Sequence, residues 1–211
     1  MITLYTWKTP NGRKPAIMLE EIGLPYAARG VDIGADEQFD PAFLALSPNN
    51  KIPAIVDDEA PGGPQALFES GAILTYLADK SGQLLTAAGP GRWAALEWLH
   101  WSIGGLGPML GQLGFFAVRS KDKAPLAIER FTTEAQRLLG VLEKRLAAAP
   151  YVAGQDYSIA DIVSYPWLHA ASTMMEPVLG DTFAASPATR DWMARLAERP
   201  AVARGMKVLE G

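Results

Sequence analysis

The spacing of apolar residues changes once along the chain, near residue 82, and this change limits the folds that the chain can adopt. Before that point, short strand-like runs alternate with helical spacing, which is typical of an α/β unit. After it, every periodic segment has helical spacing. Residues 82–90 are small and uncharged. They predict a linker between an α/β domain over residues 1–81 and an all-α domain over residues 91–211.

The first domain is expected to follow the order β-α-β-α-β-β-α. Turn residues and apolar alternation predict strands at residues 2–6, 26–33, 52–57 and 65–68. Helical spacing predicts helices from residue 11 or 12 to Gly23, over residues 40–46 and over residues 69–80. The hairpin of the last two strands interrupts what would otherwise be pure βαβ alternation.

The second domain is expected to be entirely helical. The predicted helices cover residues 92–118, around 128–142, 158–171, 187–197 and 200–208. The first of them contains Pro108, where we expect a kink. It also contains five glycines, each of which costs helix stability roughly 1 kcal/mol relative to alanine. Close approach of another helix, or of a ligand, would explain them.

The composition excludes several kinds of site. The 211 residues include no cysteine, which rules out disulfides, thiolate metal sites and a cysteine nucleophile. Two histidines are too few for a histidine-based zinc site without help from carboxylates. The net charge of −4 has the wrong sign for a dedicated nucleic-acid binder. Neither a metal nor a nucleic acid is therefore expected as a partner.

No membrane segment or secretory signal is expected. The residues between Glu97 and Arg119 carry no formal charge over a length that could span a bilayer. They include Pro108 and five glycines, however, and their neighbours are amphipathic, which favours a buried helix. Met1 leads directly into strand-like sequence, and the absence of cysteine fits a reducing compartment. A cytoplasmic location is expected.

Two stretches could bind a charged, extended ligand. In NNKIPAIVD, residues 49–57, a cis Ile52–Pro53 bond would turn the Ile52 backbone toward a peptide ligand, and Lys51 offers a cation. A trans proline and an ordinary surface lysine are the alternatives. In LFESGAI, residues 67–73, the start of a helix offers an anion site, and Glu69 could pair with an ammonium group. The alternative is that Ser70 simply caps the helix.

Together these stretches resemble the cytosolic glutathione transferase superfamily, in which a thioredoxin-like domain precedes an all-α domain. The resemblance covers the whole chain. It rests on NKIPAIVD, FESGAI followed by YLADK, and YSIADI, in which Ser158 and Asp161 form an expected capping box. TPNGRK, residues 9–14, and GGLGPMLGQ, residues 104–112, further resemble the bacterial Nu class of disulfide-bond reductases.

The resemblance implies how the chain would bind glutathione, an extended tripeptide with two carboxylates and one ammonium group. The Ile52–Pro53 bond would be cis, and the Ile52 backbone would pair with the cysteinyl part. Ser70 and Glu69 would take the γ-glutamyl carboxylate and amine. Lys51 would lie near the glycyl carboxylate.

Two further residues are implied to contribute to the same site. Gln38 would lie near the glycyl carboxylate, beside Lys51. Arg130 would reach glutathione from a central helix of the second domain, in its own subunit or in the partner's, because a homodimer is implied. A solvated helix arginine is the alternative for Arg130.

The resemblance places the glutathione sulfur at the turn between the first strand and the first helix, at the N-terminus of that helix. Several classes place a Tyr, Ser or Cys there, but cysteine is absent and Tyr5 lies several residues too early. Thr9 and Asn11 remain, and both side chains can donate a hydrogen bond to a thiolate. Such donors and a helix N-terminus lower the pKa of a thiol from about 8.5. We expect Thr9 and Asn11 to share this task.

Three functions are compatible with this site. The first is disulfide reduction, in which bound glutathione supplies the thiolate and one or two glutathione molecules, or glutathione disulfide, occupy the pocket. The second is conjugation of glutathione to electrophiles, with a second pocket lined by residues 104–119. The third is a non-catalytic binding protein of the same fold. The joint presence of the implied glutathione-binding residues favours an enzyme.

Overall fold

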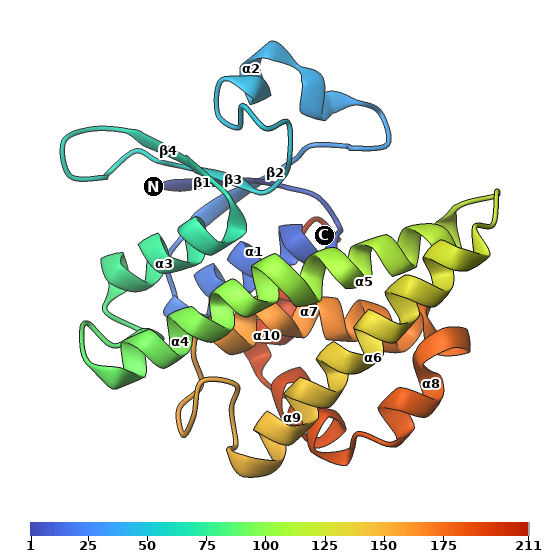
Figure 1. Cartoon of the computed structure of the whole chain (residues 1–211). Coiled ribbons are helices and arrows are strands. Elements are labelled where there is room, and N and C mark those ends of the chain that lie inside the picture. Colours follow the sequence, from blue (N-terminus) through green and yellow to red (C-terminus); the bar gives the residue numbers. More distant parts are fainter. Residues whose placement is uncertain (211) are drawn as a thin grey trace. The chain divides into compact units, whose positions relative to one another are not determined.

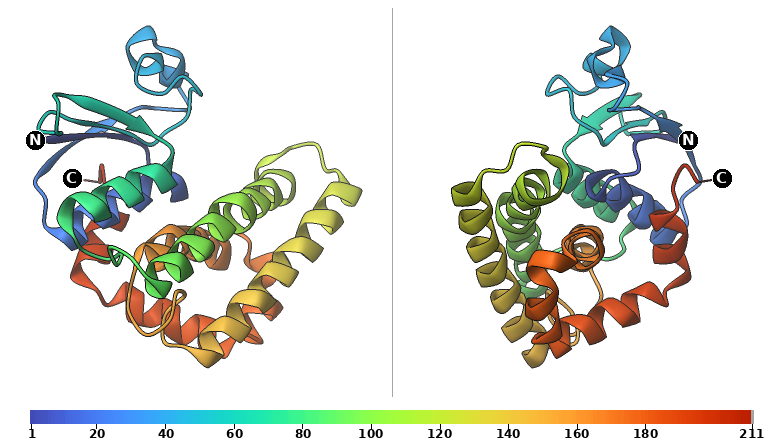
Figure 2. Two further views of the ribbon diagram at one scale, coloured as in Figure 1. Left: turned by 60° about the vertical axis from the view of Figure 1, so that its left-hand side comes forward. Right: turned by 90° about the vertical axis from the view of Figure 1, so that its right-hand side faces the viewer.

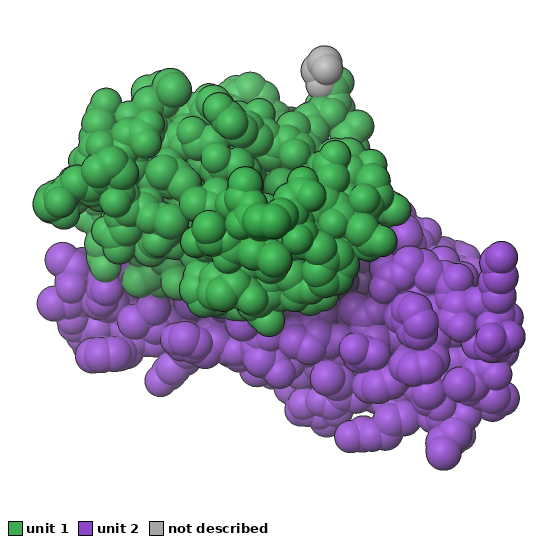
Figure 3. All heavy atoms as spheres, turned by 90° about the horizontal axis from the view of Figure 1, so that it is seen from above, with its two compact units in different colours: residues 1–83, 198–211 green, residues 84–197 purple. Residues whose placement is uncertain are grey.

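The computed structural model describes residues 1–210 and divides into two compact units. The first unit contains residues 1–83 and 198–211, and the second contains residues 84–197 (Figure 3). The first is α/β and the second is helical, so the predicted fold class is confirmed. In the described residues, no helix is long and apolar enough to cross a membrane.

The first unit is built on a mixed four-stranded sheet in the order β2-β1-β3-β4. The strands are β1 (Ile2–Thr6), β2 (Tyr26–Gly30), β3 (Ala54–Asp57) and β4 (Gln65–Phe68). Strand β1 runs parallel to β2 and antiparallel to β3, and β3 runs antiparallel to β4. The predicted bounds hold for β1 and β4, whereas β2 and β3 are shorter than expected.

Helices cover both faces of this sheet. Helices α1 (Pro10–Ile22) and α3 (Ser70–Ser81) lie on one face, and the short α2 (Pro41–Leu44) lies on the other (Figures 1 and 2). Burial alternates along β1, as expected for a strand with helices on both faces of its sheet. Ile2, Leu4 and Thr6 are buried, whereas the residues between them are half-buried. Tyr5, which precedes Thr6 and faces the opposite side of the sheet, packs against Phe43 of α2, with ring centroids 6.4 Å apart.

The C-terminal helix α10 (Pro200–Met206) belongs to the first unit and packs on α1. The backbones approach so closely that a Cβ on Gly205 would lie 2.5 Å from the Ile17 backbone. Arg204 forms an ion pair with Glu20 at 2.6 Å. Helix α1 is therefore held from the side of α10 as well as from the sheet.

The second unit contains six α-helices in the described chain. They are α4 (Pro90–Trp101), α5 (Gly107–Leu113), α6 (Pro125–Ala148), α7 (Ile159–Met174), α8 (Glu176–Ala184) and α9 (Pro187–Ala197). The expected helix over residues 92–118 is interrupted by π-helical turns at Ser102–Leu106 and Gly114–Arg119, and Pro108 starts α5. Helix α8 was not anticipated.

Close helix packing explains three of the five glycines in this segment. A Cβ on Gly107 would lie 2.8 Å from the Trp167 ring nitrogen, and one on Gly114 would lie 2.8 Å from the end of Met175. Gly111 also faces Trp167, at 3.2 Å. Gly104, in contrast, has nothing within 4 Å in the described chain.

The capping box at the start of α7 is confirmed. The Ser158 hydroxyl accepts from the Ala160 amide, and the Asp161 carboxylate accepts from the Ser158 amide at 3.0 Å. Asp161 also accepts from the Trp192 ring nitrogen at 2.8 Å, and burial raises the pKa of its carboxyl. The cluster therefore links the start of α7 to Trp192 of α9 within the second unit.

Candidate functional site

The register of the sheet gathers three separate stretches at one end of the first unit. Tyr5, near the end of β1, pairs with Ala54, the first residue of β3, and Ala54 pairs with Phe68, the last residue of β4. The segments just beyond these residues therefore lie at the same end of the sheet. They are the turn into α1, the Ile52–Pro53 pair and the junction between β4 and α3.

Thr9 is the N-cap of α1. Its Oγ1 accepts a hydrogen bond from the Gly12 amide at 3.2 Å, while its own amide donates to the Trp7 carbonyl at 2.7 Å. Pro10 occupies the first turn, where its missing N–H costs nothing. Because the Thr9 oxygen is the acceptor in this bond, its O–H hydrogen can still be donated to a ligand.

Gly12 locks this turn onto the end of β1. Its carbonyl accepts from the Thr6 hydroxyl at 2.9 Å in a buried hydrogen bond. A Cβ at this position would lie 2.1 Å from the Trp7 carbonyl oxygen, so a larger residue does not fit without a backbone shift. The first turn of α1 thus has a fixed position relative to the sheet.

Lys14 lies directly behind Asn11, in a place that the sequence interpretation missed. Its Nζ donates to the Asn11 Oδ1 at 2.8 Å, and the residue is only 2% exposed. Burial lowers the pKa of Lys14 to about 7, and the Glu69 carboxylate opposes this shift. The available signal was spacing: Lys14 lies four residues before Met18 and therefore falls on the apolar face of α1.

The peptide bond between Ile52 and Pro53 is cis, as the resemblance led us to expect. Ile52 is half-buried and packs against a small core cluster of Val31, Phe43 and Ala54. In the described chain, neither its backbone N–H nor its C=O forms a backbone hydrogen bond. Both groups are therefore available to pair with an extended peptide.

Ser70 is not a helix cap, so the simpler explanation of this residue is wrong. It is the first residue of α3, and the N-cap position is taken by Glu69, whose side chain makes no capping bond. Glu69 has a φ of 69°, a left-handed conformation that is unfavourable for a non-glycine residue and common at functional sites. The first-turn N–H groups of α3 therefore have no side-chain cap, which leaves them available to an anion.

Gln38 and Lys51 lie in the connection between β2 and β3. Gln38 belongs to the 3₁₀ turn Glu37–Phe39. Its Nε2 donates to Asp36 at 3.3 Å, and its Oε1 is buried without a partner among residues 1–210. Lys51 has an exposed side chain, and its carbonyl accepts from the Ser47 hydroxyl. No hydrogen bond of the described chain links Gln38 or Lys51 to the first turn of α1.

Arg130 belongs to the second unit. It lies on α6 and is exposed. Its charge helps to lower the pKa of Glu134, although Arg137 contributes more to that shift. Its expected role at the glutathione site remains a prediction.

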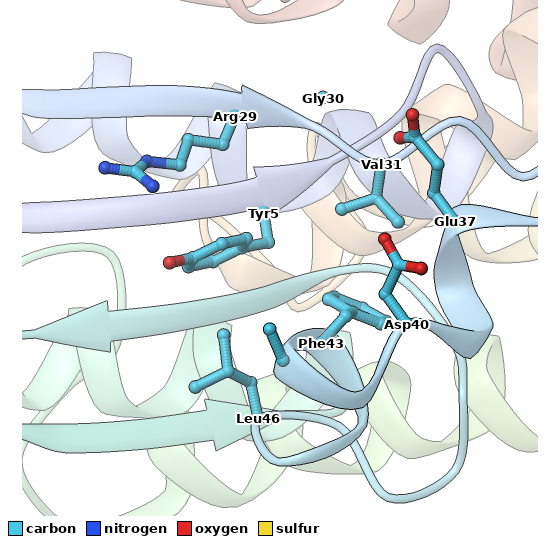
Figure 4. Close-up of a pocket in the computed structure, with 9 residues that line it drawn as sticks. Tyr5, Arg29, Gly30, Val31, Glu37, Asp40, Phe43 and Leu46 are labelled. Atoms are coloured by element: carbon cyan, nitrogen blue, oxygen red, sulfur yellow. The ribbon is translucent and has the colours of Figure 1, made fainter.

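The α2 side of the sheet carries a cavity of about 310 Å³ (Figure 4). Tyr5, Phe43 and Leu46 form part of its lining, with Arg29 above the Tyr5 ring at 6.0 Å. Figure 4 shows the Tyr5 ring among the residues that line this cavity, whereas the next residue of β1, Thr6, donates to the Gly12 carbonyl of α1 on the opposite face. Tyr5 therefore faces this cavity and not the first turn of α1, and the expected roles of Thr9 and Asn11 remain predictions.

The described residues contain no group of three or more acidic, histidine or cysteine side chains that could hold a metal ion. The site at the end of the sheet combines hydroxyl and amide donors, an unpaired stretch of backbone, an uncapped helix start and charges of both signs. Such a set fits a small peptide that carries carboxylates and an amine.

Comparison with known proteins identifies relatives over nearly the whole chain. The family described as "Glutathione S-transferase, N-terminal domain" matches residues 1–79, and "Glutathione S-transferase, C-terminal domain" matches residues 106–200. The chain is 48% identical to the disulfide-bond oxidoreductase YfcG of Escherichia coli, over 98% of this chain and 94% of that protein. It is 40% identical to YghU, a second disulfide-bond oxidoreductase of E. coli, over 97% of this chain and 73% of YghU.

Solved structures similar to this chain are also glutathione transferases. A glutathione transferase family member from Pseudomonas fluorescens, with two glutathione molecules bound, superposes with a TM-score of 0.93 at 47% identity, covering 97% of this chain and 92% of that one. A glutathione transferase from Pseudomonas putida, with one glutathione disulfide bound per subunit, superposes with a TM-score of 0.94 at 44% identity, covering 99% of this chain and 91% of that one.

Proposed function

The chain belongs to the glutathione S-transferase family, and from that premise we propose that it is a glutathione-dependent disulfide-bond reductase of the bacterial Nu class. Glutathione is its reducing substrate, and a small disulfide is the second substrate. The similarity to two disulfide-bond oxidoreductases supports this reaction. The glutathione and glutathione disulfide in the solved relatives support a pocket that holds two glutathione units.

One observation carries the proposal: the N-terminus of α1 carries two side-chain donors, Thr9 and Asn11, in a chain without cysteine. Thr9 and Asn11 are half-buried there, and Lys14 lies behind Asn11. A turn of this kind can stabilise a thiolate but has no thiol of its own. The reacting sulfur therefore arrives with glutathione.

The other residues fit the remainder of glutathione. The Ile52 backbone offers one donor and one acceptor, which matches the cysteinyl peptide group. The uncapped start of α3 with Ser70 suits the γ-glutamyl carboxylate, and Glu69 suits the amine. Lys51 supplies the cation for the glycyl carboxylate, and Gln38 adds an amide from the same connection between β2 and β3.

The reaction conserves atoms and electrons without a protein cysteine. Two glutathione thiols are oxidised to one glutathione disulfide, and the two electrons and two protons convert the substrate disulfide into two thiols. Thr9 donates its O–H and Asn11 its side-chain N–H toward the site of the sulfur. The N-terminus of α1 adds a favourable potential. These contributions favour the thiolate, which is the nucleophile in thiol–disulfide exchange.

Two assays test this function against its closest rival. Glutathione is supplied first with bis(2-hydroxyethyl) disulfide and then with 1-chloro-2,4-dinitrobenzene, a chlorinated aromatic electrophile. We expect turnover of the disulfide well above that of the electrophile. The reverse order favours a conjugating transferase. Absence of glutathione binding by calorimetry rejects both enzymes and leaves a binding protein of the same fold.

We also propose that the protein is a cytoplasmic homodimer. The exposed apolar side chains Phe68 and Trp93, 38% and 64% exposed, support association with another subunit. Sedimentation velocity should give twice the 22.7 kDa mass of one chain. A monomer at all concentrations would contradict this assembly.

A further inference from the structure

We propose that Lys14 is a positioning residue for the glutathione sulfur: it orients the Asn11 amide and places a positive charge behind it. This inference rests on the proposed function. It adds a residue whose role neither the sequence motifs nor the relatives assign.

The hydrogen bond between Lys14 and Asn11 determines how the Asn11 amide is oriented. An ammonium group can only donate, so the atom that it contacts at 2.8 Å must be the amide oxygen. The amide nitrogen, which is the donor, then points away from Lys14. Asn11 is half-buried and Lys14 is almost fully buried, so the proposal assigns this nitrogen to the sulfur in front of the first turn.

The charge of Lys14 is only partly balanced within the first unit. Lys14 forms no ion pair among the described residues. Glu69 acts on it electrostatically from the β4–α3 junction, but Glu69 is exposed. The neighbouring cation on α1, Arg13, is directed to Glu210 at 3.5 Å. A thiolate bound in front of Asn11 would supply the missing negative charge.

The thiolate and the protonated lysine therefore stabilise each other. Burial keeps the pKa of Lys14 at about 7, so its protonation responds to a new charge close by at neutral pH. A thiolate raises the pKa of Lys14, and by linkage the protonated lysine lowers the pKa of the bound thiol. The Asn11 amide lies between the two charges and is polarised by both.

The test is the pKa of the glutathione thiol in its complex with the protein, measured by thiolate absorbance near 240 nm as the pH is varied. For Lys14→Met we expect this pKa to rise by about one unit, which corresponds to a tenfold loss of thiolate near neutral pH. Lys14→Arg should keep most of the effect. Lys207→Met, which removes an exposed lysine of the same unit, should leave the pKa unchanged.

Two additional variants separate the orientation of the Asn11 amide from the effect of the Lys14 charge, and one of them replaces Lys14→Met if that variant does not fold. Lys14→Gln keeps a donor without a charge and should show an intermediate pKa. It also carries the test if Lys14→Met does not fold. In Asn11→Ala, the added Lys14→Met change should have a smaller effect, because the amide that transmits it is missing. A role for Lys14 in packing alone would move none of these thiol pKa values.

The outcomes for this inference and for the proposed function are distinguishable. Wild-type protein that does not bind glutathione, or does not reduce disulfides, contradicts the function. Wild-type protein that is active, with the same thiol pKa in folded Lys14→Met or Lys14→Gln, overturns the role of Lys14 and leaves the function standing.

Discussion

The Thr9 Oγ1 accepts a hydrogen bond from the Gly12 amide nitrogen at 3.2 Å, at the turn where we propose that the glutathione sulfur binds. It caps α1, and because the oxygen is the acceptor, the Thr9 O–H hydrogen stays available to a ligand. Thr9 therefore contributes to stability as an N-cap, and in the proposed function it also favours the thiolate as a donor. The two contributions can be separated by substitution.

Thr9→Val should lower kcat/KM for disulfide reduction by about tenfold, because the sulfur loses one of its donors while Asn11 remains. It should also lower the free energy of unfolding by about 1 kcal/mol through loss of the cap. Thr9→Ser retains both hydrogen bonds and serves as the control. Activity and urea denaturation of all three proteins give the comparison. Equal activity of the Val variant and the wild type would show that Thr9 is not a donor to sulfur.

Gly12→Ala should destabilise the protein by about 3 kcal/mol, because the new Cβ would lie 2.1 Å from the Trp7 carbonyl oxygen. The matched control is Gly140→Ala in the interior of α6, where nothing lies within 4 Å of the added carbon in the described chain. That change should be neutral or stabilising by up to about 1 kcal/mol. Thermal denaturation distinguishes the two, and similar effects would contradict the tight turn.

Lys14→Met should stabilise the protein in the absence of glutathione, and the gain should depend on pH. Burial lowers the pKa of Lys14 from 10.5 to about 7, so between these values the unfolded chain holds a proton that the folded chain has released. The stability of the wild type therefore rises as pH increases through this range. The variant should gain about 1–4 kcal/mol at pH 7, and less at about pH 9.5.

Urea denaturation at the two pH values checks this pH dependence. Lys207→Met provides the control, since Lys207 is exposed. A variant less stable than the wild type at pH 7, or a gain that does not shrink with pH, would mean that the buried lysine does not destabilise the fold.

Ser70→Ala should weaken glutathione binding with little effect on folding, because Ser70 makes no capping bond in this structure. We expect KM for glutathione to rise about tenfold through the loss of one hydrogen bond to a charged group. Ser158→Ala is the opposite case: it breaks the capping box of α7 and should cost about 1 kcal/mol of stability with KM unchanged. If Ser70→Ala destabilises the fold as much as Ser158→Ala, the assignment of Ser70 to the ligand is wrong.

Arg130→Ala should raise KM for glutathione without a change in stability, since Arg130 is exposed on α6. Arg137→Ala on the same helix removes an arginine that pairs with Glu134 at 2.7 Å and serves as the control. Steady-state kinetics with varied glutathione measures both. An unchanged KM in Arg130→Ala would make Arg130 an ordinary solvated residue.

The sequence was sufficient for the fold class because apolar spacing and turn residues agree with each other in most elements. It failed where a single residue depends on its tertiary surroundings. Ser70 has the sequence pattern of a cap, but Glu69 adopts the cap position with a φ of 69° that the sequence does not reveal. The π-helical turns around α5 were missed because they change hydrogen bonding without changing apolar spacing.

Lys14 illustrates the limit for the site. Its position on the apolar face of α1 follows from spacing, but a lysine on such a face usually extends its charge to solvent. In the structure its side chain is instead almost fully buried, and its Nζ donates to the Asn11 Oδ1. The motif TPNGRK was sufficient to predict the turn, whereas the contact between Lys14 and Asn11 is visible only in the structure.

The most direct test of the central claim is a crystal structure with glutathione bound. The claim is that the first turn of α1 activates a sulfur that the protein itself does not supply. It predicts the glutathione sulfur within hydrogen-bond distance of the Thr9 Oγ1 or the Asn11 side-chain nitrogen, with Lys14 still on the Asn11 oxygen. A sulfur farther than about 4 Å from both side chains would contradict it.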